Sequence, residues 1–394
     1  MNILYLSVLA SPEALHEAEE KDHSFSAYAV QKFHYLLARG FVGNGAKVNA
    51  LSTFFLPKVG KAYYRRSEDC EGVSYHYIPT LNSPLFRHLW LIFYCFFKVL
   101  FFGCFNRKKK VLICDVLNVS ACIGAVTAAR LIGLRRIGLV TDLPEYVVGG
   151  NSNNWQGGRK NGLSARINMS TMRNFTHYVF LTKQMDSIIN VKKRPYIVME
   201  GVVDSGFKVE TSGGAGSGKI VLYAGGLDEK YGLRLLVEGF LHAKVADSEL
   251  HVYGDGPFSA QMKEYDCLYP NVFYMGIQPN GIIVKKEQEA TLLVNPRPTT
   301  EAFTKFSFPS KNMEYMLSGT PVLTTKLPGM PEEYYPYVFL FEDETVSGYA
   351  VKIHEVLCKP EDELRNKGQD ARRWVFEQKN NIIQTKRIIE LSSM

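Results

Sequence analysis

Two series of short apolar runs, each run followed by a helix-length segment, constrain the fold of this chain more than any other feature. In the first series the runs are rich in Val, Ile and Leu, as in Asn2–Leu9, Val111–Asp115 and Arg136–Val140. The second series starts at Lys219–Ala224, after the Gly- and Ser-rich segment Glu210–Gly218. Apolar strands that alternate with helices are typical of parallel sheets covered on both faces. The pattern therefore predicts an α/β chain of two doubly wound domains.

The length of 394 residues suits two domains of ordinary size. We expect a first domain at residues 1–205, a linker at 206–218 and a second domain at 219–375. A C-terminal helix at 376–394 is expected to pack back on the first domain. Open α/β sheets bind ligands outside the carboxyl ends of their strands, so we expect a ligand cleft between the two sheets.

Charge and cysteine content indicate which partners and which cellular compartment suit the protein. Residues 1–205 carry a net charge of +11 and residues 206–394 one of −4. A basic first half indicates an anionic partner, which is nucleic acid, an anionic membrane or a phosphate-bearing substrate; the alternative is an ordinary solvated surface. The seven cysteines include no CxxC pair, which favours reduced thiols in a reducing compartment. Met1–Ala10 reads as a first strand and not as a signal peptide.

The segment Leu89–Phe105 contains seventeen residues with one charge, Lys98, and is followed by the basic cluster Arg107–Lys110. A membrane-spanning helix needs about 20 apolar residues. Strand-like runs precede and follow this segment, and a spanning helix would separate them. We therefore expect a helix that lies on a membrane surface, with the basic cluster on anionic headgroups. The alternative is a buried helix of a large α/β domain.

Glycines and cations follow several predicted strands of the second half. Gly225 and Gly226 come directly after Lys219–Ala224 and would let a diphosphate approach the backbone closely. Lys230 stands at the start of the next predicted helix, and Arg297 stands at the end of another strand, where its guanidinium group could bind phosphate through a fork of donors.

A further helix start points to the same chemistry. Pro309 suits the first turn of a helix and Ser310 suits the cap, which leaves free N–H groups for phosphate oxygens. Lys311 lies in that first turn, and Glu314 lies one turn further on the same face. A carboxylate there can accept hydrogen bonds from ribose hydroxyls. Together these residues predict a site for a nucleoside diphosphate group.

With these motifs the chain resembles GT-B glycosyltransferases of the family 4 type, which are retaining enzymes with two Rossmann-like domains. The resemblance covers the whole chain and is strongest in the second half. Glu314 begins the sequence Glu-Tyr-Met-Leu-Ser-Gly-Thr-Pro-Val, which matches the second glutamate of the family's donor helix. Gly254–Pro257 matches the family's Gly-Asp-Gly-Pro turn. The resemblance implies a nucleotide-sugar donor on the second domain and an acceptor on the first.

The chain departs from the family pattern at the diphosphate pair and at the first glutamate. Gly226 and Tyr231 occupy the slots of the family's arginine and lysine, and Lys230, Arg297 and Lys311 are the cations that could compensate. Phe306 stands where the family has its first glutamate, and Glu301 is the candidate that could replace this carboxylate at the donor sugar.

Candidate residues of the first domain lie at strand and helix ends. Asp142 is the catalytic candidate of this domain: it follows the strand Arg136–Val140, where the resemblance places a cleft-lining His or Asp, and the alternative is an N-cap before Pro144. Ser24 and Ser26 open the first long helix on the acceptor side, although Ser24 is equally explained as an N-cap. The Gly- and Asn-rich segment Val147–Gly162 reads as a long loop or a lid.

The sequence thus predicts a glycosyltransferase that moves a sugar from a nucleotide-sugar to a lipid-linked glycan in bacterial-type surface polysaccharide biosynthesis. We expect a cytoplasmic protein, peripheral on the inner face of the cell membrane. We expect no metal or other cofactor and no nucleic acid partner. Two alternatives stay open: a partner subunit that kept the fold and lost catalysis, and a GT-B nucleotide-sugar 2-epimerase.

Overall fold

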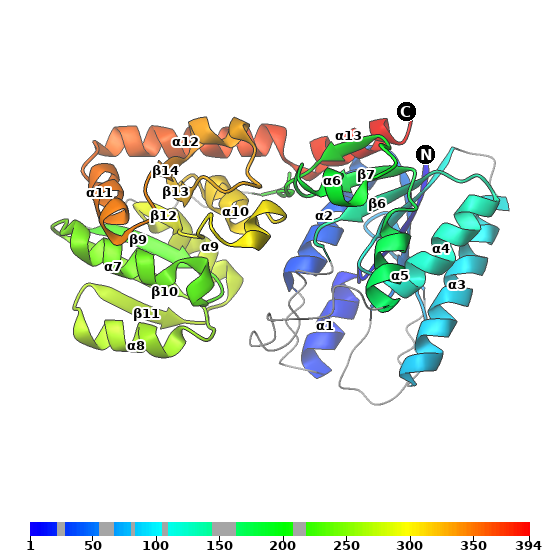
Figure 1. Ribbon diagram of the computed structural model, residues 1–394, viewed down its shortest axis with the longest axis horizontal. Helices are drawn as coiled ribbons and strands as arrows, with labels where there is room; N and C mark the ends of the chain where they lie inside the picture. The colour runs from blue at the N-terminus through cyan, green and yellow to red at the C-terminus, as the bar shows by residue number, and fades with distance from the viewer. Residues whose placement is uncertain (22–27, 55–66, 80–82, 105–108, 144–162, 208–217) are drawn as a thin grey trace. The chain divides into compact units, whose positions relative to one another are not determined.

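The computed structural model describes residues 1–21, 28–54, 67–79, 83–104, 109–143, 163–207 and 218–394. The chain forms two compact units. The first contains Met1–Val202 together with Asn381–Met394, and the second contains Val203–Asn380. Both units are layered α/β folds built on parallel strands (Figure 1). The predicted fold class of two doubly wound domains is therefore confirmed.

The first unit contains an eight-stranded sheet in the order β3-β4-β2-β1-β5-β6-β7-β8. All of its neighbouring strands pair in parallel except β3 and β4, which are antiparallel at the sheet edge. The strands are β1 (Asn2–Ser7), β2 (Lys47–Ser52), β3 (Glu68–Cys70), β4 (Val73–Tyr77), β5 (Lys110–Asp115), β6 (Arg136–Val140), β7 (His177–Phe180) and β8 (Tyr196–Val198). The helices are α1 (Pro12–Lys21), α2 (Tyr28–Gly43), α3 (Pro84–Cys104), α4 (Val119–Leu131), α5 (Leu163–Met172), α6 (Met185–Ile189) and α13 (Asn381–Leu391).

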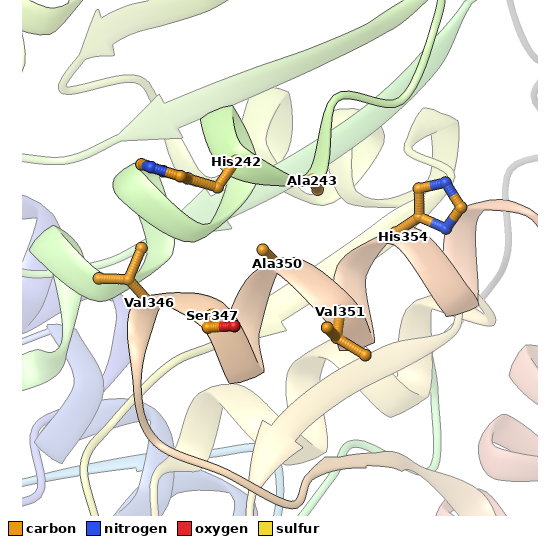
Figure 2. Close-up of a pocket in the computed structure, with 7 residues that line it drawn as sticks. All are labelled: His242, Ala243, Val346, Ser347, Ala350, Val351 and His354. Atoms are coloured by element: carbon orange, nitrogen blue, oxygen red, sulfur yellow. The ribbon is translucent and has the colours of Figure 1, made fainter.

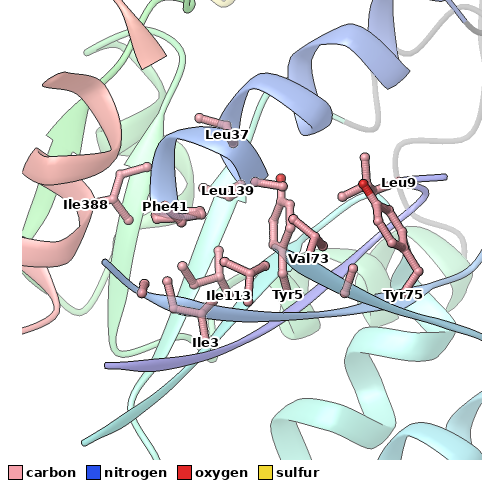
Figure 3. Packing of buried hydrophobic residues seen from close by; sticks show 14 of the residues in the cluster. Ile3, Tyr5, Leu9, Leu37, Phe41, Val73, Tyr75, Ile113, Leu139 and Ile388 are labelled. Carbon is pink, nitrogen blue, oxygen red and sulfur yellow. The ribbon is translucent and has the colours of Figure 1, made fainter. Parts of the chain in front are cut away.

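The C-terminal helix α13 is part of the core of the first unit. Ile388 of α13 lies beside Phe41 of α2 among the buried apolar side chains (Figure 3). Asn44 donates hydrogen bonds from Nδ2 to the Ile382 carbonyl oxygen at 2.8 Å and to Thr385 Oγ1 at 3.0 Å. A Cβ at Gly40 would stand 2.2 Å from the Asn381 carbonyl oxygen, so only glycine allows this approach of the two helices.

The second unit contains a six-stranded parallel sheet in the order β11-β10-β9-β12-β13-β14. Its strands are β9 (Lys219–Ala224), β10 (Ser248–Tyr253), β11 (Val272–Gly276), β12 (Leu292–Asn295), β13 (Val322–Thr325) and β14 (Phe339–Phe341). Its helices are α7 (Leu233–Ala243), α8 (Ser259–Leu268), α9 (Asn280–Glu289), α10 (Ser310–Ser318), α11 (Val346–Leu357) and α12 (Glu361–Gln378), with 3₁₀ turns η2 (Glu229–Tyr231), η3 (Ala302–Lys305) and η4 (Glu332–Tyr337).

The strand order of the second unit reverses between β9 and β12. From β9 the chain moves outward through β10 to β11, and then returns to the other side of β9. The carboxyl ends of strands at such a switch point diverge and leave a crevice for ligands. Gly225 follows β9 and Arg297 closely follows β12, so two of the predicted donor residues lie at this position.

Candidate functional site

The loops after β9 and β10 are in direct contact. The Gly225 N–H donates a hydrogen bond to the Tyr253 carbonyl oxygen at 3.0 Å. Gly254 has a φ of 129°, and a Cβ there would stand 1.8 Å from the Gly225 carbonyl oxygen. A side chain at Gly254 is therefore incompatible with this packing. Gly226 continues the loop, and its carbonyl oxygen accepts a hydrogen bond from the Tyr223 hydroxyl at 2.8 Å.

The start of α10 is fixed beside this glycine loop by Tyr315. The buried Tyr315 hydroxyl accepts a hydrogen bond from the Ala224 N–H at 2.8 Å and donates one to the Ala224 carbonyl oxygen at 3.1 Å. A Cβ at Gly225 would stand 3.0 Å from Cε of Lys311. The structure therefore brings Lys311 and the glycine loop together, as a shared phosphate site requires.

Ser310 does not cap α10, so that part of the sequence prediction is wrong. The N-cap position is Pro309, whose φ of −65° and ψ of 114° are extended and which makes no side-chain cap bond. Ser310 is the first helical residue and is exposed. The Asn312 N–H donates to the Pro309 carbonyl oxygen at 3.0 Å, whereas the N–H groups of Ser310 and Lys311 have no partner among the described residues and are available to a ligand.

Arg297 contacts two aromatic rings that meet edge to face, Tyr231 and Phe303. Its guanidinium carbon lies 4.7 Å from the centre of the Tyr231 ring and 5.4 Å from the centre of the Phe303 ring. Nη1 lies 3.5 Å from Ser307 Oγ, and the buried Nε has no hydrogen-bond partner among the described residues. Burial lowers the pKa of Arg297.

No ion pair joins Arg297 to a carboxylate within the described part of the chain. A desolvated cation without a counter-ion is unfavourable, because the lost hydration is repaid only by a nearby negative charge. Contact with two aromatic rings also restricts the orientation of the planar fork of donors. Arg297 therefore has the environment of an anion-binding residue.

Lys230 is placed differently from the prediction. It lies on the 3₁₀ turn η2 and not on α7, because Gly232, with a φ of 83°, separates the two elements. Its Nζ forms an ion pair with Asp228 Oδ2 at 3.0 Å. A Cβ at Gly232 would stand 2.0 Å from the Pro296 carbonyl oxygen, so this turn packs against the end of β12. Lys230 thus lies near Arg297, but its charge is already balanced.

The two predicted carboxylates of the second unit, Glu301 and Glu314, lie on elements that border the carboxyl edge of its sheet. Glu314 is half-buried on α10, one turn after Lys311. Glu301 is half-buried at the N-cap of η3, and its carbonyl oxygen accepts hydrogen bonds from Thr304 N at 3.0 Å and Oγ1 at 2.6 Å. The same turn carries Phe303, one of the two rings on Arg297. The role of Glu301 at a donor sugar stays a prediction.

In the first unit, Asp142 lies just after β6 beside a buried polar chain that the sequence analysis missed. The Tyr5 hydroxyl lies 2.5 Å from His34 Nδ1, and His34 Nε2 lies 3.4 Å from Asp115 Oδ2. Asn118 Nδ2 donates to the same Asp115 oxygen at 2.8 Å. These residues come from three different elements and the loop after β5, so no local pattern connects them. Ser24, Ser26 and the segment Val147–Gly162 lie outside the described residues.

Burial, followed by the nearby Asp115 charge, raises the pKa of Asp142 to about 6 from the ordinary value of 3.8. The folded state therefore holds this proton more tightly than the unfolded state. The contribution of Asp142 to the free energy of unfolding is complete below about pH 4 and is lost as the pH rises through about 6.

Asp142→Asn is accordingly expected to increase the free energy of unfolding more at about pH 8 than at about pH 4, because it removes a buried charge. If Asp142 also acts in catalysis, as the sequence predicts, the same variant loses turnover while it gains stability. Urea unfolding at both pH values, combined with a turnover assay, measures both effects. A variant that is less stable at every pH would show that Asp142 is a structural residue.

A separate hollow lies between α7 and α11 of the second unit (Figure 2). It has a volume of about 610 Å³ and is bordered by His242 and His354. None of the predicted donor residues lines it. Across the described residues, no three His, Cys, Asp or Glu side chains gather into a metal-binding group; that the protein needs no metal stays a prediction.

Comparison with known families relates the carboxyl edge of the second unit's sheet, where the predicted donor residues lie, to a class of enzyme. We call this edge the donor-side edge. Residues 218–359 match the family model described as "Glycosyl transferases group 1". This range contains Gly225, Gly226, Lys230, Arg297, Glu301, Ser310, Lys311 and Glu314. No curated protein matches the chain in sequence.

Solved structures share the fold over the whole chain. A sucrose-phosphate synthase from Thermosynechococcus elongatus is 14% identical, with a TM-score of 0.66 and coverage of 99% of this chain and 98% of that one. Anabaena HepE in complex with UDP-glucose is 12% identical, with a TM-score of 0.62 and full coverage of both chains. The lipopolysaccharide outer core galactosyltransferase WaaB is 13% identical, with a TM-score of 0.60 and 99% coverage of each chain.

These likenesses show the two-domain fold of GT-B glycosyltransferases. Together with the family match in the second unit, they support a glycosyltransferase of the GT-B class. Within that class, it is the second unit that is similar to the group 1 glycosyl transferases.

Proposed function

We propose that this protein transfers a sugar, with retention of configuration, from a nucleotide-sugar to a lipid-linked glycan during the synthesis of a surface polysaccharide. The proposal is supported above all by Arg297, a largely desolvated cation at the switch point of the sheet that has no counter-ion among the described residues. The solved neighbour HepE is described in complex with UDP-glucose, which supports a nucleotide-sugar as the donor. The proposed location is the inner face of the cell membrane.

In the proposed reaction the bond between the anomeric carbon and the diphosphate oxygen breaks, and the nucleoside diphosphate leaves with the electron pair. The acceptor hydroxyl oxygen forms the new bond to the same carbon. Its proton passes to the leaving phosphate oxygen. Arg297, Lys311 and the N–H groups at the start of α10 stabilise the negative charge that develops on the diphosphate.

The test of the proposed function is a donor screen with the full chain. Release of nucleoside diphosphate is followed for a panel of nucleotide-sugars, with and without a membrane lipid extract. We expect one donor to be turned over, faster when the extract is present. Binding of a donor without turnover under all conditions would identify a non-catalytic partner subunit, and conversion of the sugar without an acceptor would identify an epimerase.

Glu314→Gln is expected to leave the free energy of unfolding nearly unchanged and to lower turnover about tenfold. An ionised carboxylate accepts hydrogen bonds from two ribose hydroxyls more strongly than an amide does, and the isosteric amide preserves packing on α10. Steady-state kinetics with the identified donor measures the effect, and Glu264→Gln on α8 is a matched control. Full activity of the Glu314 variant would limit this residue to a structural role.

A further inference from the structure

Helix α3 has two faces of different character, although nearly all of its residues are apolar. Its inner face packs on α4: Cys95 and Val99 are fully buried, and a Cβ at Gly124 of α4 would stand 1.9 Å from the Ile92 carbonyl oxygen. The two helices lie side by side (Figure 1). His88 Nδ1 lies 2.8 Å from Ser120 Oγ at the start of the contact. The inner face is thus fully occupied by the protein itself.

The outer face carries a stripe of exposed aromatic side chains. Phe86, Phe93, Phe97 and Phe101 are 63%, 59%, 52% and 59% exposed, and Leu89 and Trp90 fill the gap between the first two. At about 100° per residue these positions fall on one side of the helix, opposite Cys95 and Val99. Only 11% of the most apolar window of α3 is buried, whereas the core helix of a soluble protein is mostly buried. We call these six residues the α3 stripe.

Charge restricts what can cover the α3 stripe. The sequence has no acidic residue between Glu71 and Asp115, but it has six Lys and Arg residues there. Arg87 and Lys98 are eleven residues apart, which is three helical turns, so both flank the stripe on the same side. Two copies joined through α3 would bring these cations toward one another, and the segment between Glu71 and Asp115 contributes no acidic residue to offset them. An anionic lipid surface complements them, and long basic side chains can reach the headgroups while their stems stay on apolar surface.

Topology excludes a spanning arrangement of α3. β4 precedes the helix and β5 follows it, and both belong to one sheet in which β2 and β1 lie between them. A helix that crossed the bilayer would place these strands on opposite sides. A helix that is covered by α4 on one face and apolar on the other can lie in the plane of the interface.

We propose that the α3 stripe is the membrane-binding surface of the first unit, with α3 lying in the plane of an anionic bilayer and its aromatic rings at the boundary of headgroups and acyl chains. This membrane-binding surface would bring the enzyme to its acceptor, and it rests on the proposed function only in that the proposed acceptor is lipid-linked. The Trp90 indole donates a hydrogen bond to the Pro79 carbonyl oxygen at 2.9 Å, just after β4. The first turns of α3 therefore lie at the carboxyl edge of the sheet, the edge that also carries Asp142.

The structure also changes which cations should be tested. Lys110 Nζ donates to the Gly103 carbonyl oxygen at the end of α3, and Lys109 Nζ donates to Ser393 Oγ at 2.6 Å. Replacing these lysines would disturb the packing of the first unit, and residues 105–108 lie outside the described residues. Lys98 is exposed, and its Nζ lies 5.6 Å from the Tyr94 ring. Lys98→Gln is therefore the cleaner charge variant.

The test uses the full chain and vesicles of phosphatidylcholine with or without phosphatidylglycerol, and co-sedimentation measures the partition coefficient. We expect binding to the anionic vesicles, a loss of at least about tenfold in the variant Phe93→Ser with Phe97→Ser, and a smaller loss in Lys98→Gln or at raised salt. The control is Leu268→Ser with Ile277→Ser, which removes two exposed apolar side chains of the second unit and should bind as the wild type does.

A second readout locates the contact. Trp90 lies on the α3 stripe, so brominated lipid should quench part of the tryptophan emission of the wild type and not of Trp90→Phe. Equal binding of the stripe variant and the wild type, or no binding by the wild type, would overturn the proposal. A wild type that dimerises without lipid, and a stripe variant that does not, would identify a second copy as the occupant.

Failure of this proposal can be distinguished from failure of the proposed function. Nucleotide-sugar turnover without lipid does not depend on the α3 stripe, so the stripe variant should keep the wild-type rate in that assay. Turnover without vesicle binding would refute only the membrane surface. Vesicle binding without turnover of any donor would refute only the glycosyltransferase.

Discussion

Arg297→Met is expected to lower kcat for sugar transfer by about a hundredfold or more, because loss of one preorganised donor to a developing anion has about that effect. Methionine has a similar length and can lie against the Tyr231 and Phe303 rings. The substitution also removes a half-buried cation that has no counter-ion among the described residues. We therefore expect the free energy of unfolding to stay the same or to rise. Loss of activity with gain of stability is the pattern of a functional residue.

The matched variant is Arg297→Lys, which keeps the charge and loses the planar fork of donors. It is expected to fall between the wild type and the methionine variant in kcat. Turnover and urea unfolding of all three proteins make the comparison. An Arg297→Met protein that unfolds more easily and keeps its activity would show that the contact of Arg297 with the two rings serves stability alone.

Lys311→Ala is expected to weaken the binding of nucleoside diphosphate by about 10- to 100-fold, since a hydrogen bond to a charged group contributes roughly 1.5–3 kcal/mol. The side chain of Lys311 lies along Gly225, and the same helix start offers N–H groups to the same anion. Titration calorimetry with UDP and GDP measures the change. Lys263→Ala on α8 removes an exposed lysine of the same unit and should bind as the wild type does. Equal dissociation constants for Lys311→Ala and the wild type would place the phosphate site elsewhere.

The strands that form the two sheet centres were predictable because they are continuous apolar runs bounded by turn residues. β3 was not predicted, since its three residues, Glu68–Cys70, are polar and pair only at the sheet edge. α1 and α9 were missed for a related reason. Their sequences are strongly polar, so the apolar spacing of a buried helix face is weak there.

The glycines and cations of the donor-side edge could be found from the sequence because they follow strands directly. The aromatic residues that hold them could not. Tyr315 bonds to Ala224 across 91 positions of the chain, and Phe303 and Tyr231 reach Arg297 from two different turns. Such contacts depend on which strands are neighbours in the sheet, and no local sequence pattern determines the strand order. The error at Ser310 is local: an extended Pro309 delays the helix start by one residue.

A nucleoside diphosphate is expected to bind at the carboxyl edge of the second unit, between the glycine loop after β9 and the start of α10. Hydrogen–deuterium exchange of the full chain with and without UDP or GDP measures this binding at the level of segments. We expect slower exchange at residues 225–232, 297–303 and 310–314 when the nucleotide is present. Unchanged exchange in these three segments, with a bound nucleotide shown by calorimetry, would contradict this expectation.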